Sequence, residues 1–144
     1  MTYTVGIDVG STYSKALILS DDFRIVGKAL AHTGFKLAEL SRKLFALSLE
    51  QAGLAETDVA YVVATGFGRH MVPFSNVAVT DLTASARGTA FLFPKTRTVL
   101  DVGGQTMKAS GHSWSLMKLV TRLYMLSLLP GQPKTLMRHA RQKQ

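Results

Sequence analysis

Short apolar runs separated by turn residues open the chain and predict a sheet. Residues 2–9, 14–20 and 23–31 each have the length and composition of a strand. A glycine turn separates the first two runs, and Asp21 and Asp22 mark a turn before the third. The first two runs are therefore expected to pair as a hairpin, with a third strand after them.

Residues 36–52 have a different spacing, which predicts an amphipathic helix. Their leucines recur at roughly the spacing of one helix face, charged residues lie between them, and Gly53 follows as a C-terminal cap. We expect this helix to pack on the sheet. The leucines are Leu37, Leu40, Leu44, Leu47 and Leu49.

Further along, short strands alternate with a second helix. Residues 59–64 form a continuous apolar run typical of a buried strand, and 76–80 and 98–102 are shorter strand candidates. Asp81 is expected to cap a helix that ends at about Phe93, where a proline follows. Three strands, a helix, two strands, a helix and a strand predict an α/β domain with a mixed sheet.

Two predicted strands end in an aspartate followed by glycines and polar residues. An aspartate fixed at a strand end can face Mg²⁺ directly or through water, and glycines let backbone N–H groups approach phosphate oxygens. Two such turns predict two hairpins that hold a polyphosphate and its metal in one cleft. The first turn has Asp8, Gly10, Ser11, Thr12 and Lys15; the second has Asp101, Gly103, Gly104 and Gln105.

Charge and composition divide the chain. The net charge is +8, but residues 1–101 hold ten Lys or Arg against nine acids, whereas 102–144 hold seven and no acid. With no cysteine, the chain itself cannot form disulfides or ligate a zinc ion or iron–sulfur cluster through thiolates. The start does not resemble a signal peptide, and no apolar run reaches the ~18 residues of a membrane span, so a cytoplasmic protein is expected.

Five segments together resemble the ATPase family of benzoyl-CoA reductase subunits and 2-hydroxyacyl-CoA dehydratase activators. This family is part of the actin, sugar kinase and heat-shock chaperone ATPase superfamily. The resemblance covers about residues 4–109 and implies that 1–109 form the first lobe of an actin-like (ribonuclease H-like) ATPase. Residues 67–109 look closest to the benzoyl-CoA reductase branch. The segments are 6–12, 64–69, 80–88, 92–94 and 101–105.

The resemblance also implies residue roles and partners. Asp8 would bind Mg²⁺ through water, and Asp101 would orient Mg²⁺ or the attacking water as the other catalytic residue. Family members bind ATP between two lobes, and two homologous ATPase subunits share a four-iron, four-sulfur cluster. ATP hydrolysis then drives a low-potential electron into a CoA-thioester reductase or dehydratase. Gly10, Ser11, Thr12, Lys15, Gly103, Gly104 and Gln105 would contact the phosphates.

The resemblance stops after Ala109. Family members continue into a second lobe with a Cys-Ala-Ala-Gly-Thr-Gly-like segment and the adenosine site, and this chain has neither. We therefore expect a truncated ATP-binding subunit or activator that is weakly active or inactive alone, without the cluster. An inactive nucleotide-binding remnant or interaction module is one alternative. A truncated sugar or polyol kinase is another, although no sugar-binding polar cluster is evident.

Residues 110–144 form a basic tail that allows three interpretations. A changed reading frame just after Ala109 explains best why the resemblance ends and the acids disappear. A divergent genuine tail, disordered or helical, is the second interpretation. A basic amphipathic helix that binds anionic lipid, nucleic acid or an acidic partner is the least favoured.

Two basic residues before the tail receive structural interpretations. Arg69 ends the turn at 65–69, which is expected to let the chain leave the sheet; contact with a nucleotide or partner subunit is the less favoured role. Arg87 is expected to be a solvated or ion-paired base on the surface of the second helix.

Overall fold

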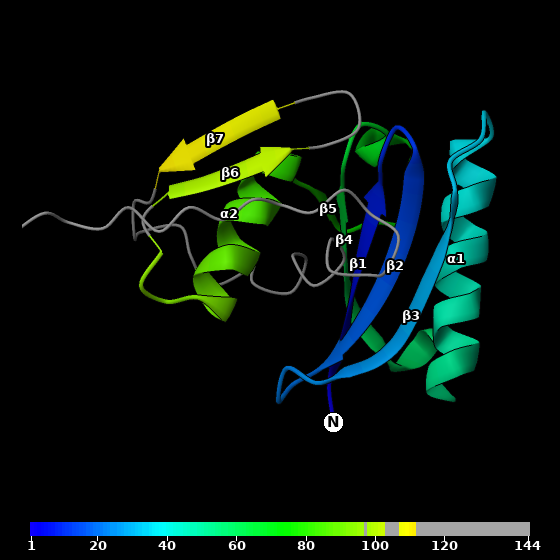
Figure 1. Cartoon of the computed structure of the whole chain (residues 1–144). Coiled ribbons are helices and arrows are strands. Elements are labelled where there is room, and N and C mark those ends of the chain that lie inside the picture. Colours follow the sequence, from blue (N-terminus) through cyan, green and yellow to red (C-terminus); the bar gives the residue numbers. More distant parts are fainter. Residues whose placement is uncertain (97, 103–106, 112–144) are drawn as a thin grey trace, which may run out of the picture.

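The computed structural model, which describes residues 1–96, 98–102 and 107–111, contains a mixed five-stranded sheet with strand order β3-β2-β1-β4-β5 (Figure 1). Strands β1, β2 and β3 pair antiparallel, whereas β1, β4 and β5 pair parallel. This arrangement confirms the predicted α/β class. The strands are β1 (Tyr3–Val9), β2 (Tyr13–Ser20), β3 (Ile25–His32), β4 (Val59–Thr65) and β5 (Val77–Ala78).

Helix α1 (Leu37–Ala52) covers one face of the sheet and ends where the sequence predicts. Gly53 adopts φ +66° and donates its N–H to the carbonyl of Glu50 at 3.1 Å, which caps the helix. The helix packs on the sheet as expected, but Leu47, one of the five leucines in the predicted pattern, is 43% exposed. Phe45 and Ser48 are buried instead, so the helix contacts the sheet along a stripe slightly rotated from the leucines.

Helix α2 (Asp81–Leu92) lies on the opposite side of the sheet (Figure 1). Its N-cap is Thr80, whose hydroxyl accepts a hydrogen bond from the Thr83 N–H at 3.1 Å. The prediction of an Asp81 cap is therefore wrong by one residue: Asp81 is already helical and accepts from the neighbouring Leu82 N–H. Helix α2 also contacts a second, two-stranded sheet made of β6 (Thr98–Val102) and β7 (Met107–Gly111).

Two apolar clusters identify the two faces of the main sheet. Side chains alternate between the faces along each strand, so residues of one parity share a face. On the α2 face lie even-numbered β1 residues together with odd-numbered residues of β2 and β4. The α1 cluster includes Val5, Ile7, Ala16, Ile18, Leu44 and Phe45; the α2 cluster contains Leu17, Leu19, Val63 and Ala84.

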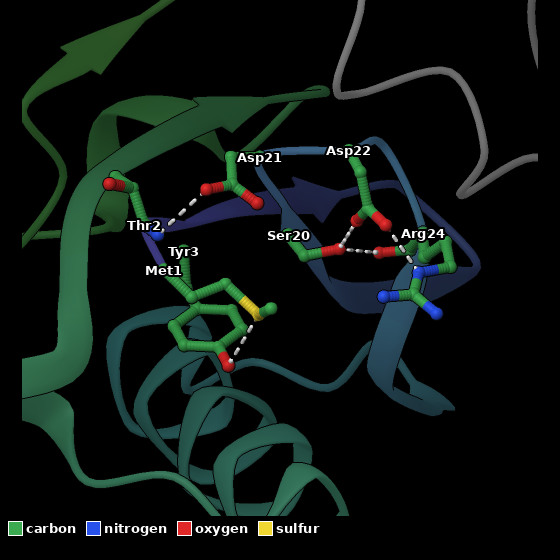
Figure 2. A network of polar contacts seen from close by, with 7 residues as sticks. All are labelled: Met1, Thr2, Tyr3, Ser20, Asp21, Asp22 and Arg24. Carbon is green, nitrogen blue, oxygen red and sulfur yellow. Dashed lines mark hydrogen bonds and ion pairs between the residues drawn. The ribbon is translucent and has the colours of Figure 1, made fainter.

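The turn between β2 and β3 is closed by polar contacts, which Figure 2 shows. The Ser20 hydroxyl contacts the Asp22 carboxylate, and Arg24 Nε lies 2.6 Å from Asp22 Oδ2. The hydrogen bond from Ser20 is the main cause of the lowered pKa of Asp22, and the charge of Arg24 lowers it further. Phe23 has φ +63°, so β3 begins at Ile25 rather than at residue 23.

Two short 3₁₀ helices, η1 (Glu56–Asp58) and η2 (Arg69–Met71), were not predicted. Strand β5 is shorter than expected because Asn76 binds β4 with its side chain: its Oδ1 accepts from the Val62 N–H at 2.7 Å. In the part of the chain that the structure describes, no helix is both long and apolar enough to cross a bilayer.

Candidate functional site

The β1–β2 hairpin brings together all the predicted site residues of the first turn. Asp8 and Lys15 are directly opposite each other in the antiparallel register. Lys15 Nζ lies 3.4 Å from Asp8 Oδ2, and their side chains are 7% and 21% exposed. Water screens such a pair less than it would a surface pair. The hairpin therefore holds one carboxylate and one ammonium group at a fixed, partly accessible position.

The turn itself is tightly bent and anchored. A Cβ on Gly10 would come within 2.6 Å of the Tyr13 carbonyl oxygen, so only glycine fits there without a shift. The Thr12 carbonyl accepts a hydrogen bond from the Thr33 N–H at 2.9 Å, which ties the turn to the end of β3. Ser11 and Thr12 are exposed. The turn thus presents hydroxyl groups to solvent on a fixed backbone.

The end of β4 lies next to the Asp8–Lys15 pair. Thr65 is paired in register with Asp8, and Gly66 follows with φ +88°. A Cβ on Gly66 would overlap with Asp8 Oδ1 and with the Val9 carbonyl oxygen. The Gly68 N–H donates to that same carbonyl at 2.8 Å. Because Gly66 has no Cβ, the backbone at this position packs directly against the Asp8 carboxylate.

The turn after β4 has a larger role than the sequence indicated. It does lead the chain away from the sheet, as predicted, but it also encloses Asp8. The sequence signal for this contact with Asp8 was a glycine directly after a buried strand. The sequence alone does not show that this strand pairs with β1, so the contact was not predicted. Arg69 donates from Nη1 to the Gly66 carbonyl at 3.2 Å, so within the described residues it braces its own turn.

Arg87 differs from its predicted place at the surface. It is only 6% exposed, and its Nε has no hydrogen-bond partner among the residues described. Loss of solvent lowers the pKa of its guanidinium. The physical reason is that α2 packs against both the main sheet and the β6–β7 pair, so little of its surface is left exposed.

Residues of the second predicted turn are only partly described. Asp101 lies in β6, one residue before that strand ends, whereas Gly103, Gly104 and Gln105 lie outside the described residues. Asp8, Lys15 and Thr65 lie on the α2 face of the main sheet, the side on which β6 and β7 also lie (Figure 1). A common cleft for Asp8 and Asp101 remains a prediction.

The donor set is compatible with Mg²⁺ bound mainly by water and phosphate. Within the ranges 1–96, 98–102 and 107–111, no group of three or more His, Cys, Asp or Glu is placed to hold a metal ion. Mg²⁺ in phosphate sites usually keeps several waters and takes only one or two carboxylates. The Asp8 carboxylate, partly accessible and packed against the Gly66 backbone, fits this kind of site.

Comparison with known proteins identifies related sequences. The BadF/BadG/BcrA/BcrD ATPase family matches residues 5–113. The chain is 40% identical over 107 residues to the activator of lactoyl-CoA dehydratase of Anaerotignum propionicum. It is 39% identical over 107 residues to the (R)-2-hydroxyglutaryl-CoA dehydratase activating ATPase of Acidaminococcus fermentans. Each match covers 74% of this chain and 41% of the relative, so the chain spans about two fifths of their length.

A more distant match is a benzoyl-CoA reductase subunit of Thauera aromatica, 35% identical over 114 residues that cover 72% of this chain and 38% of the relative. The predicted preference for the benzoyl-CoA reductase branch therefore receives no support, since identity to the dehydratase activators is higher.

Solved structures agree with the fold. Component A of the A. fermentans (R)-2-hydroxyglutaryl-CoA dehydratase aligns with TM-score 0.72 and 36% identity, over 78% of this chain and 44% of that chain. An activator of the 2-hydroxyisocaproyl-CoA dehydratase from Clostridium difficile, with bound ADPNP, aligns with TM-score 0.69 and 36% identity, over 77% and 41%. A ROK hexokinase from Thermus thermophilus, at TM-score 0.57 and 17% identity over 76% and 46%, supports the fold alone.

Proposed function

Because the chain belongs to the BadF/BadG/BcrA/BcrD ATPase family, we propose that residues 1–109 are the phosphate-binding lobe of an ATPase. This ATPase would couple ATP hydrolysis to low-potential electron transfer into a CoA-thioester dehydratase or reductase. One observation carries the proposal: the Asp8–Lys15 pair at the end of the hairpin, enclosed by the backbone of Gly66. An exposed anchored turn beside that pair has the groups that a triphosphate needs.

The residues of this lobe would divide the work of phosphate binding. Gly10, Ser11 and Thr12 would donate hydrogen bonds to the outer phosphates, and Lys15 would neutralise part of their charge. Asp8 would hold Mg²⁺ through water, and Asp101 would orient the ion or the attacking water. The ion, when bound, would supply charge neutralisation, which phosphoryl transfer needs more than it needs covalent chemistry. Gly103, Gly104 and Gln105 would contact phosphates from the second hairpin.

For the partner, we favour a 2-hydroxyacyl-CoA dehydratase over a benzoyl-CoA reductase. The support is the higher identity to dehydratase activators, 40% and 39% against 35%. A homologous ATPase subunit would be the second partner. Because this chain has no cysteine, any shared iron–sulfur cluster would need cysteine ligands from outside these 144 residues.

Binding of MgATP to the purified 144-residue chain tests the phosphate site. NMR titration at up to millimolar nucleotide gives the dissociation constant for the wild type, Asp8→Asn and Lys15→Met. Lys43→Met, at an exposed position of α1 on the other face of the sheet, is the matched control. Loss of one charge-assisted contact is expected to weaken binding about tenfold or more in Lys15→Met.

Asp8→Asn is expected to weaken binding only when Mg²⁺ is present, because its carboxylate acts through the ion. Equal affinity in all four proteins, or no MgATP binding by the wild type, would overturn the proposed function.

A further inference from the structure

The two hairpins share a feature beyond their aspartates and glycines. In the β1–β2 hairpin, Asp8 is opposite Lys15; in the β6–β7 hairpin, Asp101 is opposite Lys108. In both hairpins the lysine follows the aspartate by seven positions, and Val-Gly comes directly after the aspartate. The two hairpins therefore have the same antiparallel register, and four residues separate the partners of the pair nearest the turn in each: Val9 and Ser14 in the first, Val102 and Met107 in the second.

Register determines which residues share a face. Residues directly opposite each other in an antiparallel pair lie on the same face of the ribbon, at neighbouring positions. In the first hairpin this placement produces the Asp8–Lys15 ion pair at 3.4 Å. Lys108 occupies in β7 the register position that Lys15 occupies in β2. The second hairpin thus repeats the aspartate–lysine combination of the first.

We propose that Lys108 is a second phosphate-binding lysine, which contacts the outer phosphates of ATP from the β6–β7 side. This inference rests on the proposed function, because it assigns Lys108 to the same nucleotide. A triphosphate carries more negative charge than Lys15 and one Mg²⁺ neutralise. A second ammonium group from the β6–β7 hairpin would neutralise part of the remaining charge.

A purely structural role is the competing explanation. Opposite charges at paired positions stabilise the pairing of two strands, so in this explanation Lys108 serves only to pair with Asp101 and hold β7 in place. If the role of Lys108 is structural, replacing it changes the midpoint of thermal unfolding and leaves the ratio of ATP to ADP affinity unaltered. A phosphate contact changes the affinity for ATP more than that for ADP, which lacks the outermost phosphate.

The test compares Lys108→Met with Lys108→Arg, Lys15→Met and the control Lys43→Met in the full chain. NMR titrations give the dissociation constants of MgATP and MgADP, and circular dichroism gives the midpoint of thermal unfolding. Lys108→Met is expected to weaken MgATP binding about tenfold and to lower the ratio of ATP to ADP affinity. Lys108→Arg is expected to restore most of the binding, because it keeps the charge.

The outcomes separate this inference from the proposed function. If Lys15→Met weakens MgATP binding and Lys108→Met does not, the phosphate site stands and the role of Lys108 is wrong. If Lys108→Met lowers the unfolding midpoint while the ATP to ADP ratio stays constant, Lys108 is structural and the inference is also wrong. If the wild type does not bind MgATP, both proposals fall.

Discussion

At the residue scale, the Asp8 carboxylate lies between two different neighbours. Lys15 approaches Oδ2 with its ammonium group, and the backbone of Gly66 approaches Oδ1. The lysine lies opposite one carboxylate oxygen as its ion-pair partner, while the glycine leaves the other oxygen without a Cβ in front of it. The chemistry of Asp8 therefore depends on a residue that is 58 positions away and has no side chain.

Gly66→Ala tests how strongly that position is constrained. A left-handed φ costs alanine roughly 1–2 kcal/mol, and overlap of the new Cβ with Asp8 and Val9 adds roughly 1–3 kcal/mol. We expect the free energy of unfolding to fall by about 3 kcal/mol, measured by urea denaturation. MgATP binding should weaken as well, since the carboxylate must move.

Gly53→Ala is the matched control for this measurement. Gly53 also has a positive φ, +66°, but a Cβ added there would meet nothing within 4 Å. In Gly53→Ala the free energy of unfolding should fall only by the backbone contribution, roughly 1–2 kcal/mol, and the affinity for MgATP should stay unchanged. Equal losses in the two variants would mean that contact with Asp8 adds nothing.

At the element scale, the β2–β3 turn is held by charge and by an aromatic pair. Asp22 contacts Ser20 and Arg24, as Figure 2 shows, while the ring of Phe23 lies 5.1 Å from that of Phe91 in α2. The left-handed Phe23 thus connects the hairpin to α2, on the face of the sheet that also carries Asp8 and Lys15. The turn stabilises the position of α2 as well as the pairing of β2 with β3.

The lowered pKa of Asp22 predicts a pH dependence of stability. A carboxyl whose pKa is lower in the folded state stabilises the fold above its ordinary value of 3.8, and this contribution is lost as the pH falls through the lowered value. The thermal midpoint of the wild type should therefore exceed that of Asp22→Asn at about pH 6, and the difference should shrink toward about pH 2.

Glu50→Gln, at an exposed position of α1, gives the effect of removing an exposed carboxylate outside this turn. A constant difference between the wild type and Asp22→Asn over the whole range would contradict the role of the Ser20 and Arg24 contacts.

Elements with strong local signals could be predicted from the sequence, whereas contacts created by pairing could not. The leucine spacing and Gly53 identified α1, but the small and polar residues of β7 give a weak strand signal, and only the predicted second hairpin pointed to this strand. The turn after β4 was recognised, but its contact with Asp8 depends on the parallel pairing of β1 with β4. Periodicity of a single segment carries no information about such neighbours.

At the scale of the whole molecule, one face of the sheet packs against α1 and the other carries the candidate site. Helix α1 covers one face with an apolar cluster that includes the inward side chains of β1 and β2. The Asp8–Lys15 pair lies on the other face, on the side of α2 and the second hairpin. A nucleotide bound there would contact one lobe through its phosphates, and its adenosine part would need further protein.

This division predicts that the 144-residue chain hydrolyses ATP weakly or not at all. Phosphoryl transfer depends on positioning of the phosphates and the attacking water, and the chain spans only 41% of the length of its A. fermentans relative. Release of phosphate from MgATP should stay near the level of Asp8→Ala, with that relative as the positive control. Steady hydrolysis that Asp8→Ala abolishes would instead mean that one lobe suffices for catalysis.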